Sequence, residues 1–363
     1  MKSVAYRYFK NLFLPNKLSF LIFFVTSECN AACPFCLNRD FSSVKNGGEG
    51  FSPLELTKEE IKEFASHIKN LPHLLISGGE PFIREDLAEI VSSFYQRSDT
   101  RLVTVPTNGY YFETIESNVK KILMKCPGIN LRIHLSVNGV GSIHDQTKRL
   151  PESFENLKKT YTRLIKLKDK YSNLIMASIT VITKELKGHL SELVNFFERE
   201  MPFLDDYYIT SIRKGRENKE IIYLSSLERN SWKDFEKKQK IKMRRKSFLH
   251  IYSSCVLKRA DKVINDSFKN RTAILPCLAG MKFIVLKEDG TVFPCEIKAN
   301  KDMGNIRNFQ YDIKKLLMNS RAREVANEIK TRECYCDWGC AMNINLISRW
   351  RYCFKIFLDA LRY

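Results

Sequence analysis

The chain has 363 residues, of which 44% are hydrophobic and 12% aromatic, a composition that excludes a mainly disordered protein. Its 60 lysines and arginines outnumber 41 acidic residues and give a formal charge of +19, which favours an anionic partner, although basic residues dispersed over a solvated surface give the same total. The 11 cysteines are clustered, which fits metal ligation in a reducing cytoplasm better than a secreted disulfide framework. We expect no signal peptide, because no small-residue cleavage site follows the basic N-terminal segment.

The first predicted elements are a buried strand and a cysteine loop. Residues 20–26 are almost all β-branched or aromatic, which is typical of a strand inside a parallel sheet. Cys29, Cys33 and Cys36 follow this strand and supply three thiolates where a four-iron cluster needs four ligands, so one iron would stay open. A zinc site, a disulfide and buried thiols are the alternatives, but structural zinc sites use four ligands in two short pairs.

A helix and a glycine loop come next. Residues 57–68 begin with a threonine cap followed three residues later by Glu60, which predicts a helix. The strand at 74–77 then enters Gly78-Gly79-Glu80-Pro81, and adjacent glycines allow a ligand or another backbone to approach closely. An ordinary turn is the alternative.

Strand and helix alternate further along the chain. Strands are predicted at residues 102–105, 131–137, 175–183 and 207–213, and a helix at 186–200. Six strands with intervening helices predict an α/β fold, a partial (β/α)6 TIM-like barrel. Its functional residues should lie at the carboxyl ends of the strands, where the motifs named above also fall.

A second cysteine group lies near the other end of the chain. An Asp289-Gly290 turn between two apolar runs predicts a hairpin of residues 283–286 and 291–295. The thiols around it suffice for one further iron–sulfur cluster and are too few for two, and a zinc site built from four cysteines is the alternative. These thiols belong to Cys277, Cys295, Cys334, Cys336 and Cys340.

The predicted domains are a basic and aromatic segment at 1–18, the barrel at 19–216, a helical bridge at 217–275, the cysteine-rich hairpin domain at 276–345, and a basic amphipathic helix at 346–363. Two interpretations of the last helix stay open, since it can pack on the barrel or dock peripherally on an anionic membrane.

The leading motifs resemble those of the radical S-adenosylmethionine (radical SAM) superfamily. The resemblance lies in the cysteine spacing with Phe35 before the last cysteine, in the glycine loop after the second strand, and in Ser136-Val137-Asn138-Gly139 followed by His144-Asp145. It implies a [4Fe-4S] cluster on the leading cysteine triplet, with S-adenosyl-L-methionine bound beside Phe35 at the open iron.

The resemblance also implies roles for individual residues. Gly78, Gly79 and Glu80 would hold the methionine amino group of S-adenosylmethionine. Ser136 and Asn138 would bind ribose hydroxyls, although Asn138 stands where aspartate is commoner in the family. Arg149 would pair with the methionine carboxylate.

The C-terminal cysteines resemble the SPASM/Twitch extension of such enzymes. They depart from its full seven-cysteine arrangement, so the resemblance implies one auxiliary [4Fe-4S] cluster. Cys277, Cys295 and Cys340 are the strongest candidate ligands, and Cys334 and Cys336 compete for the fourth place.

The function that the resemblance implies is reductive cleavage of S-adenosylmethionine to a 5′-deoxyadenosyl radical, which abstracts a substrate hydrogen. A one-electron reductant such as flavodoxin or ferredoxin would be required. The substrate hypotheses are a small or carrier-linked molecule, an anionic sugar or glycoconjugate that is oxidised or epimerised, and a peptide, in which case the chain is a peptide (RiPP) maturase. An oxidoreductase and an isomerase are both compatible with this. The alternative from another class is a non-enzymatic protein that holds zinc or clusters and binds nucleic acid.

Overall fold

The computed structural model describes residues 4–12, 14, 17–36, 38, 55–212, 224–243, 248–298, 300–331, 334–336 and 338–361. The strands are β1 (Phe20–Phe24), β2 (His73–Ser77), β3 (Leu102–Thr107), β4 (Asn130–Ser136), β5 (Leu174–Ile182), β6 (Asp206–Ser211), β7 (Phe283–Leu286), β8 (Thr291–Phe293) and β9 (Gly304–Asn305). The helices are α1 (Val4–Leu12), α2 (Lys58–Ser66), α3 (Leu87–Arg97), α4 (Phe112–Lys125), α5 (Ser142–Lys148), α6 (Ser153–Lys168), α7 (Leu190–Arg199), α8 (Ser226–Met243), α9 (Phe248–Asn270), α10 (Ile313–Met318), α11 (Ser320–Ile329), α12 (Gly339–Ile347) and α13 (Trp350–Leu361), with short 3-10 helices η1 (Pro81–Ile83) and η2 (Ile306–Phe309).

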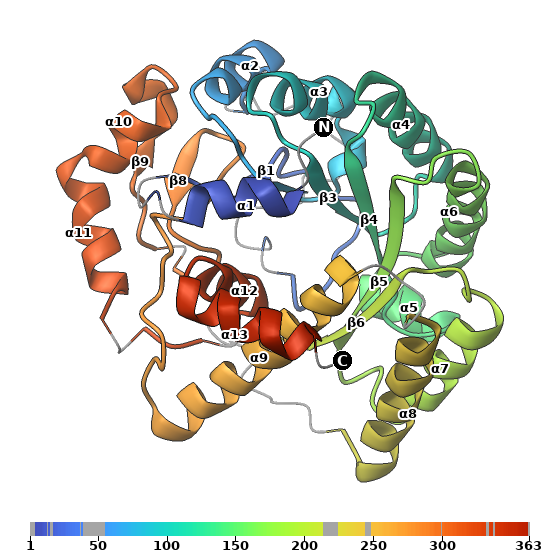
Figure 1. Cartoon of the computed structure of the whole chain (residues 1–363). Coiled ribbons are helices and arrows are strands. Elements are labelled where there is room, and N and C mark those ends of the chain that lie inside the picture. Colours follow the sequence, from blue (N-terminus) through green and yellow to red (C-terminus); the bar gives the residue numbers. More distant parts are fainter. Residues whose placement is uncertain are drawn as a thin grey trace.

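One curved sheet organises the molecule. Its strand order is β6-β5-β4-β3-β2-β1-β7-β8-β9, and β1 to β6 pair in parallel. Helices α2, α3, α4, α6 and α7 cover the outer face of this sheet (Figure 1). The predicted partial barrel is therefore confirmed, and it is open rather than closed.

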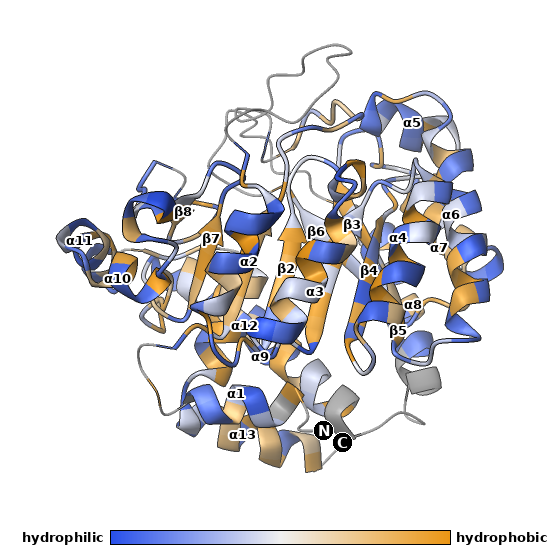
Figure 2. Ribbon diagram, turned by 90° about the horizontal axis from the view of Figure 1, so that it is seen from above, coloured by the Kyte–Doolittle hydropathy of each residue, from blue (hydrophilic) through white to orange (hydrophobic). Residues whose placement is uncertain are grey.

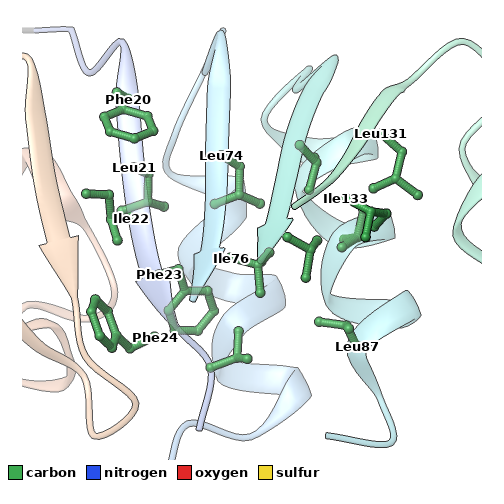
Figure 3. Close-up of a cluster of buried hydrophobic side chains, with 14 of the residues drawn as sticks. Phe20, Leu21, Ile22, Phe23, Phe24, Leu74, Ile76, Leu87, Leu131 and Ile133 are labelled. Carbon is green, nitrogen blue, oxygen red and sulfur yellow. The ribbon is translucent and has the colours of Figure 1, made fainter. Parts of the chain in front are cut away.

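The main hydrophobic core lies between the strands and the outer helices. All five residues of β1 are buried, because β1 is an inner strand with side chains packed on both faces. In β4, Leu131 and Ile133 are fully buried among the apolar side chains of the core (Figure 3). Arg132 and His134 alternate with them along the strand and therefore lie on the inner face of the sheet. The sequence of β4 thus creates one apolar face and one polar face.

Helix α2 begins as its sequence predicts. The Thr57 hydroxyl accepts a hydrogen bond from the Glu60 N–H at 3.2 Å, and the Glu60 carboxylate accepts one from the Thr57 N–H at 2.9 Å. This capping box satisfies two backbone donors that the first turn leaves without partners.

The C-terminal hairpin continues the barrel sheet. Strands β7 and β8 occupy the predicted hairpin positions, but β7 also pairs in parallel with β1. An ion pair fastens this extension to α2, because Arg307 Nε and Nη2 lie 2.6 and 3.0 Å from the Glu60 carboxylate oxygens. The Tyr311 hydroxyl donates to the same carboxylate at 2.8 Å.

Helix α1 closes the end of the sheet where the strands begin. The Arg7 guanidinium binds Asp99 before β3. Before β2, Asn11 Nδ2 donates to the Asn70 backbone carbonyl, and Asn70 Nδ2 donates to Asn11 Oδ1. Helix α13 lies at the same end of the molecule, opposite α5 (Figure 2). No helix in the described part of the chain is both long enough and apolar enough to cross a bilayer.

Some element bounds differ from those that the sequence predicts. The tail contains two helices, α12 and α13, where one was expected, with a break at Ser348 and Arg349. Two long helices, α8 and α9, occupy most of the predicted bridge, whose residues 217–223 lie outside the described residues. Strand β6 ends at Ser211, two residues before the predicted end at Arg213, which also lies outside them.

Candidate functional site

The cysteine loop and the glycine loop are bonded to each other at the carboxyl ends of β1 and β2. Gly79 N–H donates to the Thr26 carbonyl at 2.9 Å, and Glu80 N–H donates to the Glu28 carbonyl at 2.7 Å. Asn38 then donates a side-chain hydrogen bond back to the Gly78 carbonyl. The strand pairing of β1 with β2 therefore continues into the loops and fixes their relative position.

The two glycines are required by this close approach. A Cβ atom at Gly78 would overlap the carbonyl oxygen of Thr26, and one at Gly79 would overlap that of Glu28. Gly78 also has a φ of +138°, a conformation that other residues rarely adopt. The glycines thus allow the two loops to touch, which is a structural role beside the predicted contact with a ligand.

The leading cysteines carry features that suit thiolates. Cys29 Sγ accepts a hydrogen bond from the Ala31 N–H at 3.4 Å, and Cys36 Sγ accepts one from Asn38 N–H at 3.4 Å. Backbone donors aimed at sulfur favour the negative form that iron requires. Burial opposes ionisation and raises the pKa of Cys29 to about 12, so ligation there would release a proton. All three cysteines and Phe35 are half-buried.

Glu80 is a buried carboxyl with three hydrogen-bond donors around it. It receives bonds from the Thr107 hydroxyl at 2.8 Å, from Asn108 N–H at 2.8 Å and from Phe82 N–H at 3.3 Å. Burial outweighs these donors and raises the pKa of Glu80 to about 7. Through these bonds Glu80 ties the glycine loop to the loop after β3.

The cation nearest to this cluster is Lys148. Its side chain is 4% exposed, and its charge opposes the rise in the pKa of Glu80. Its carbonyl accepts from Ala32 N–H at 3.0 Å, so the end of α5 contacts the cysteine loop. The Lys148 amine has no hydrogen-bond acceptor among the described residues. Arg149, by contrast, is exposed and ends α5 in a left-handed conformation.

The sequence motifs did not point to Lys148, although its spacing from His144 predicts that it lies on the buried face of a helix. His144 and Lys148 are four residues apart and therefore lie on one face of α5. His144 is fully buried, so Lys148 is turned inward with it, whereas Arg149 is not.

The residues predicted to bind ribose lie at the end of β4. Ser136 is half-buried and ends the strand on its inner face. Asn138 is 1% exposed, and its side-chain oxygen accepts from Val181 N–H at 3.0 Å. Its backbone N–H donates to His144 Nδ1 at 3.2 Å. The side-chain nitrogen of Asn138, Nδ2, is therefore the group that could donate to a ribose hydroxyl. His144 supports the turn that follows β4.

The second cysteine group surrounds the hairpin. Cys277 Sγ accepts a hydrogen bond from Asn345 Nδ2 at 3.7 Å, and Asn345 Oδ1 accepts from Leu278 N–H at 2.9 Å. Cys295 is buried and accepts from Lys298 N–H at 3.4 Å. Burial raises the pKa of Cys295 to about 12, with smaller contributions from Cys277 and Cys336.

The structure brings four of these five cysteines within electrostatic reach of one another. Cys277 raises the pKa values of both Cys295 and Cys334 after burial, and Cys336 also raises that of Cys295. Cys340 lies in the first turn of α12 and raises the pKa values of Tyr8 and Tyr208, which lie toward the inner face of the sheet. None of the eleven cysteines, all of which are described, forms a disulfide.

The donor sets fit iron–sulfur clusters by their chemistry. Both groups consist of thiols, and N–H groups point at Cys29, Cys36, Cys277 and Cys295. The described residues contain no group of three or more histidine, cysteine or acidic side chains placed to hold a single metal ion. In a cube each thiolate binds a different iron, so cluster ligation does not call for such a group.

Sequence comparisons find proteins that are similar to this chain. Residues 23–197 match the sequence profile of the Radical SAM superfamily. The chain is 25% identical over 284 residues to the AdoMet-dependent heme synthase of Methanosarcina barkeri, covering 75% of this chain and 74% of that enzyme. It is 25% identical over 138 residues to the GTP 3′,8-cyclase of Pasteurella multocida, covering 36% of this chain and 40% of the cyclase.

Solved structures show the same fold. Native anSMEcpe with bound AdoMet has a TM-score of 0.57 at 16% identity, covering 95% of this chain and 97% of its own. Streptococcus suis SuiB bound to S-adenosylmethionine has a TM-score of 0.55 at 15% identity, covering 87% of this chain and 68% of its own.

Proposed function

We propose that the chain is a radical SAM enzyme, because residues 23–197 match the Radical SAM superfamily, and that Cys29, Cys33 and Cys36 hold its [4Fe-4S] cluster at the carboxyl end of β1. The observation that carries the proposal is the bonded pair of cysteine and glycine loops, whose contact depends on Gly78 and Gly79. When bound, the cluster and S-adenosylmethionine supply one-electron cleavage of the sulfonium and removal of a substrate hydrogen.

The residues around the triplet would position S-adenosylmethionine. Its methionine carboxylate would pair with the buried Lys148 amine rather than with the exposed Arg149. Its amino group would lie against the backbone of the glycine loop near Glu80, and Ser136 and Asn138 would meet the ribose. Because Glu80 and Lys148 are almost fully buried, water is excluded on this side.

The C-terminal cysteines are proposed to hold one auxiliary [4Fe-4S] cluster. Cys277, Cys295 and Cys340 would supply three ligands, and Cys334 or Cys336 would supply the fourth that a cube needs; Cys277 and Cys295 have hydrogen-bonded sulfurs. Since β7 pairs with β1, this cluster and the leading one would be carried by neighbouring strands of a single sheet.

The proposed substrate is a small or carrier-linked molecule that carries negative charge, with an anionic sugar or glycoconjugate as the first hypothesis. The formal charge of +19 supports it. The alternative of a peptide maturase would be favoured by a short precursor-peptide gene beside this one. The match to an enzyme superfamily argues against the non-enzymatic, nucleic-acid-binding alternative.

Partners and location are proposed from the same features. The reducing electron would come from flavodoxin or ferredoxin, and eleven free cysteines suit the cytoplasm. Helix α13 exposes Trp350, Phe354 and Phe357 beside the exposed cations Arg351 and Lys355. Exposed aromatic rings interleaved with cations fit peripheral contact with an anionic membrane.

The test is anaerobic reconstitution followed by iron and sulfide counts and an assay for 5′-deoxyadenosine with dithionite. About eight irons per chain and 5′-deoxyadenosine formation are expected. A triple variant with Cys29, Cys33 and Cys36 changed to alanine should keep about four irons and form no 5′-deoxyadenosine. Zinc in place of iron, or turnover by the triple variant, would refute the proposal.

A further inference from the structure

The inner face of the barrel sheet carries a group of polar side chains that the proposed cofactor contacts do not use. They alternate with apolar residues that face the outer helices. In β4 they are Arg132 and His134, and the strand register places Thr104 of β3 beside Arg132. His73 of β2 hydrogen-bonds the Thr104 hydroxyl at 2.9 Å, and Tyr208 of β6 packs against His134 with ring centroids 5.6 Å apart.

Arg132 has no protein partner in this group. Its Nε atom is inaccessible to solvent and makes no hydrogen bond, and its guanidinium forms no ion pair with any described residue. The residue as a whole is half-buried, so part of the side chain is open to solvent or to a ligand. A buried N–H group without an acceptor is costly, because its desolvation is not compensated.

The side chains around Arg132 do not neutralise it. Burial and the Arg132 charge lower the pKa values of His73 and His134 to about 3, so both rings are neutral. Asp206 of β6 hydrogen-bonds the Tyr208 hydroxyl and also acts on His134. Tyr8 of α1 approaches from the closed end of the sheet, where Arg132 lowers its pKa against the effect of burial. Asp206 is the carboxylate that acts on this group, and its bond goes to Tyr208 rather than to Arg132.

The position of Arg132 relates it to the proposed site. Ser136 and Arg132 lie on the same face of β4, four residues apart, which corresponds to about 13 Å along a strand. Ser136 stands at the end that carries the cysteine loop, and Arg132 lies deeper toward α1. A molecule of modest size can therefore span the distance between them.

We propose that Arg132 binds an oxyanion, a carboxylate or a phosphate, of the substrate, and so holds the substrate on the inner face of the sheet with its reacting C–H bond toward the cysteine loop. The planar guanidinium can give two parallel hydrogen bonds to such a group. His73, His134 and the tyrosines add neutral donors around it. That the anion belongs to the substrate rests on the proposed function, whereas anion binding at Arg132 rests on the geometry alone.

The test measures anion binding to the full reconstituted protein by isothermal titration calorimetry. The probes are benzoate, phenyl phosphate and benzamide, the last being a neutral analogue of benzoate. Arg132→Gln removes the charge, and Arg132→Lys keeps the charge but cannot give two parallel hydrogen bonds. Arg97→Gln makes the same charge change at an exposed residue of α3.

Wild-type protein and Arg97→Gln are expected to bind at least one of the two anions and not benzamide. Arg132→Gln should weaken that binding by about tenfold or more, the loss expected for a charge-assisted hydrogen bond, and Arg132→Lys should lie between. Preference for benzoate or for phenyl phosphate identifies the oxyanion. If Arg132→Gln does not fold, the comparison of wild type with Arg132→Lys decides.

The proposal is overturned if wild type binds neither anion, or if removal of the guanidinium leaves the affinity unchanged. Formation of 5′-deoxyadenosine by the same wild-type preparation is measured separately. Anion binding without that product would leave the Arg132 site standing and refute the proposed function. Formation of 5′-deoxyadenosine without anion binding would refute the Arg132 site and leave the proposed function standing.

Discussion

At the scale of single residues, Lys148 shows how one position along a helix decides which cation enters the site. Lys148 and Arg149 are adjacent in the sequence, but the end of α5 turns the first inward and leaves the second exposed. The family resemblance alone pointed to Arg149. The helical spacing from the buried His144 was the physical signal for Lys148, and it depends on knowing that this segment is a helix.

This difference can be measured directly. Lys148→Gln should weaken binding of S-adenosylmethionine to the reconstituted protein by about tenfold or more, because it removes a buried charge-assisted contact. Arg149→Gln should change the affinity by less than about twofold, as expected for an exposed side chain. Equilibrium binding by calorimetry compares them, and the reverse ranking would refute the assignment.

The glycine loop gives a second prediction at this scale. Gly79→Ala should lower the free energy of unfolding by about 3 kcal/mol, because its Cβ would overlap the Glu28 carbonyl. Gly188 is the matched control, since it has a positive φ of +88° but open space around a Cβ, and its change to alanine should cost about 1 kcal/mol. Urea unfolding of the metal-free proteins measures both. Equal losses would show that the loops need no close approach.

At the scale of elements, the strands and α2 followed from the sequence, whereas the pairing of β7 with β1 did not. The apolar run of β1 and the capping box of α2 are local patterns, so residue type and spacing suffice to predict them. The contact between β7 and β1 joins residues more than 250 positions apart, and nothing in either strand specifies its neighbour.

The ion pair between Arg307 and Glu60 tests how the C-terminal extension is fastened to the barrel. The hydrogen bonds from Arg307 lower the pKa of Glu60 to about 2. A carboxyl with a lowered pKa stabilises the fold above its unfolded value and loses this contribution as the pH falls toward the folded value. Glu60→Gln keeps the capping box and should cost about 2 kcal/mol at pH 6.

That cost should shrink as the pH falls from about 4.5 toward 3, where the wild-type carboxylate begins to lose its advantage. Urea unfolding of the metal-free protein across this range measures it. Glu59→Gln, at an exposed neighbouring position, should differ from wild type by less than about 0.5 kcal/mol. A Glu60→Gln deficit that does not depend on pH would mean that packing, not the ion pair, joins the two parts.

At the scale of the whole molecule, the positive charge and the exposed aromatic residues of α13 suggest contact with an anionic surface. Trp350→Ala combined with Phe354→Ala should reduce cosedimentation with phosphatidylserine-containing vesicles by about tenfold. Phe203→Ala, at an equally exposed phenylalanine before β6, should have no effect. Vesicle binding that is absent in wild type, or unchanged in the double variant, would leave α13 without a membrane role.

The whole molecule also shows where sequence reasoning stops. The parallel order of six strands was predictable, because alternating strands and helices allow few other arrangements. The inner face of the sheet was not, since Arg132, His73 and Tyr208 come together only through strand register and curvature. The residues of the proposed oxyanion site are therefore ones that required the structure.

The most direct test of the account is electron paramagnetic resonance of the leading cluster in a variant with Cys277, Cys295, Cys334, Cys336 and Cys340 changed to alanine. The account predicts a reduced [4Fe-4S] signal in this variant that changes when S-adenosylmethionine is added, because one iron has no protein ligand. A cluster whose signal is identical with and without S-adenosylmethionine would contradict it, as would the absence of any cluster.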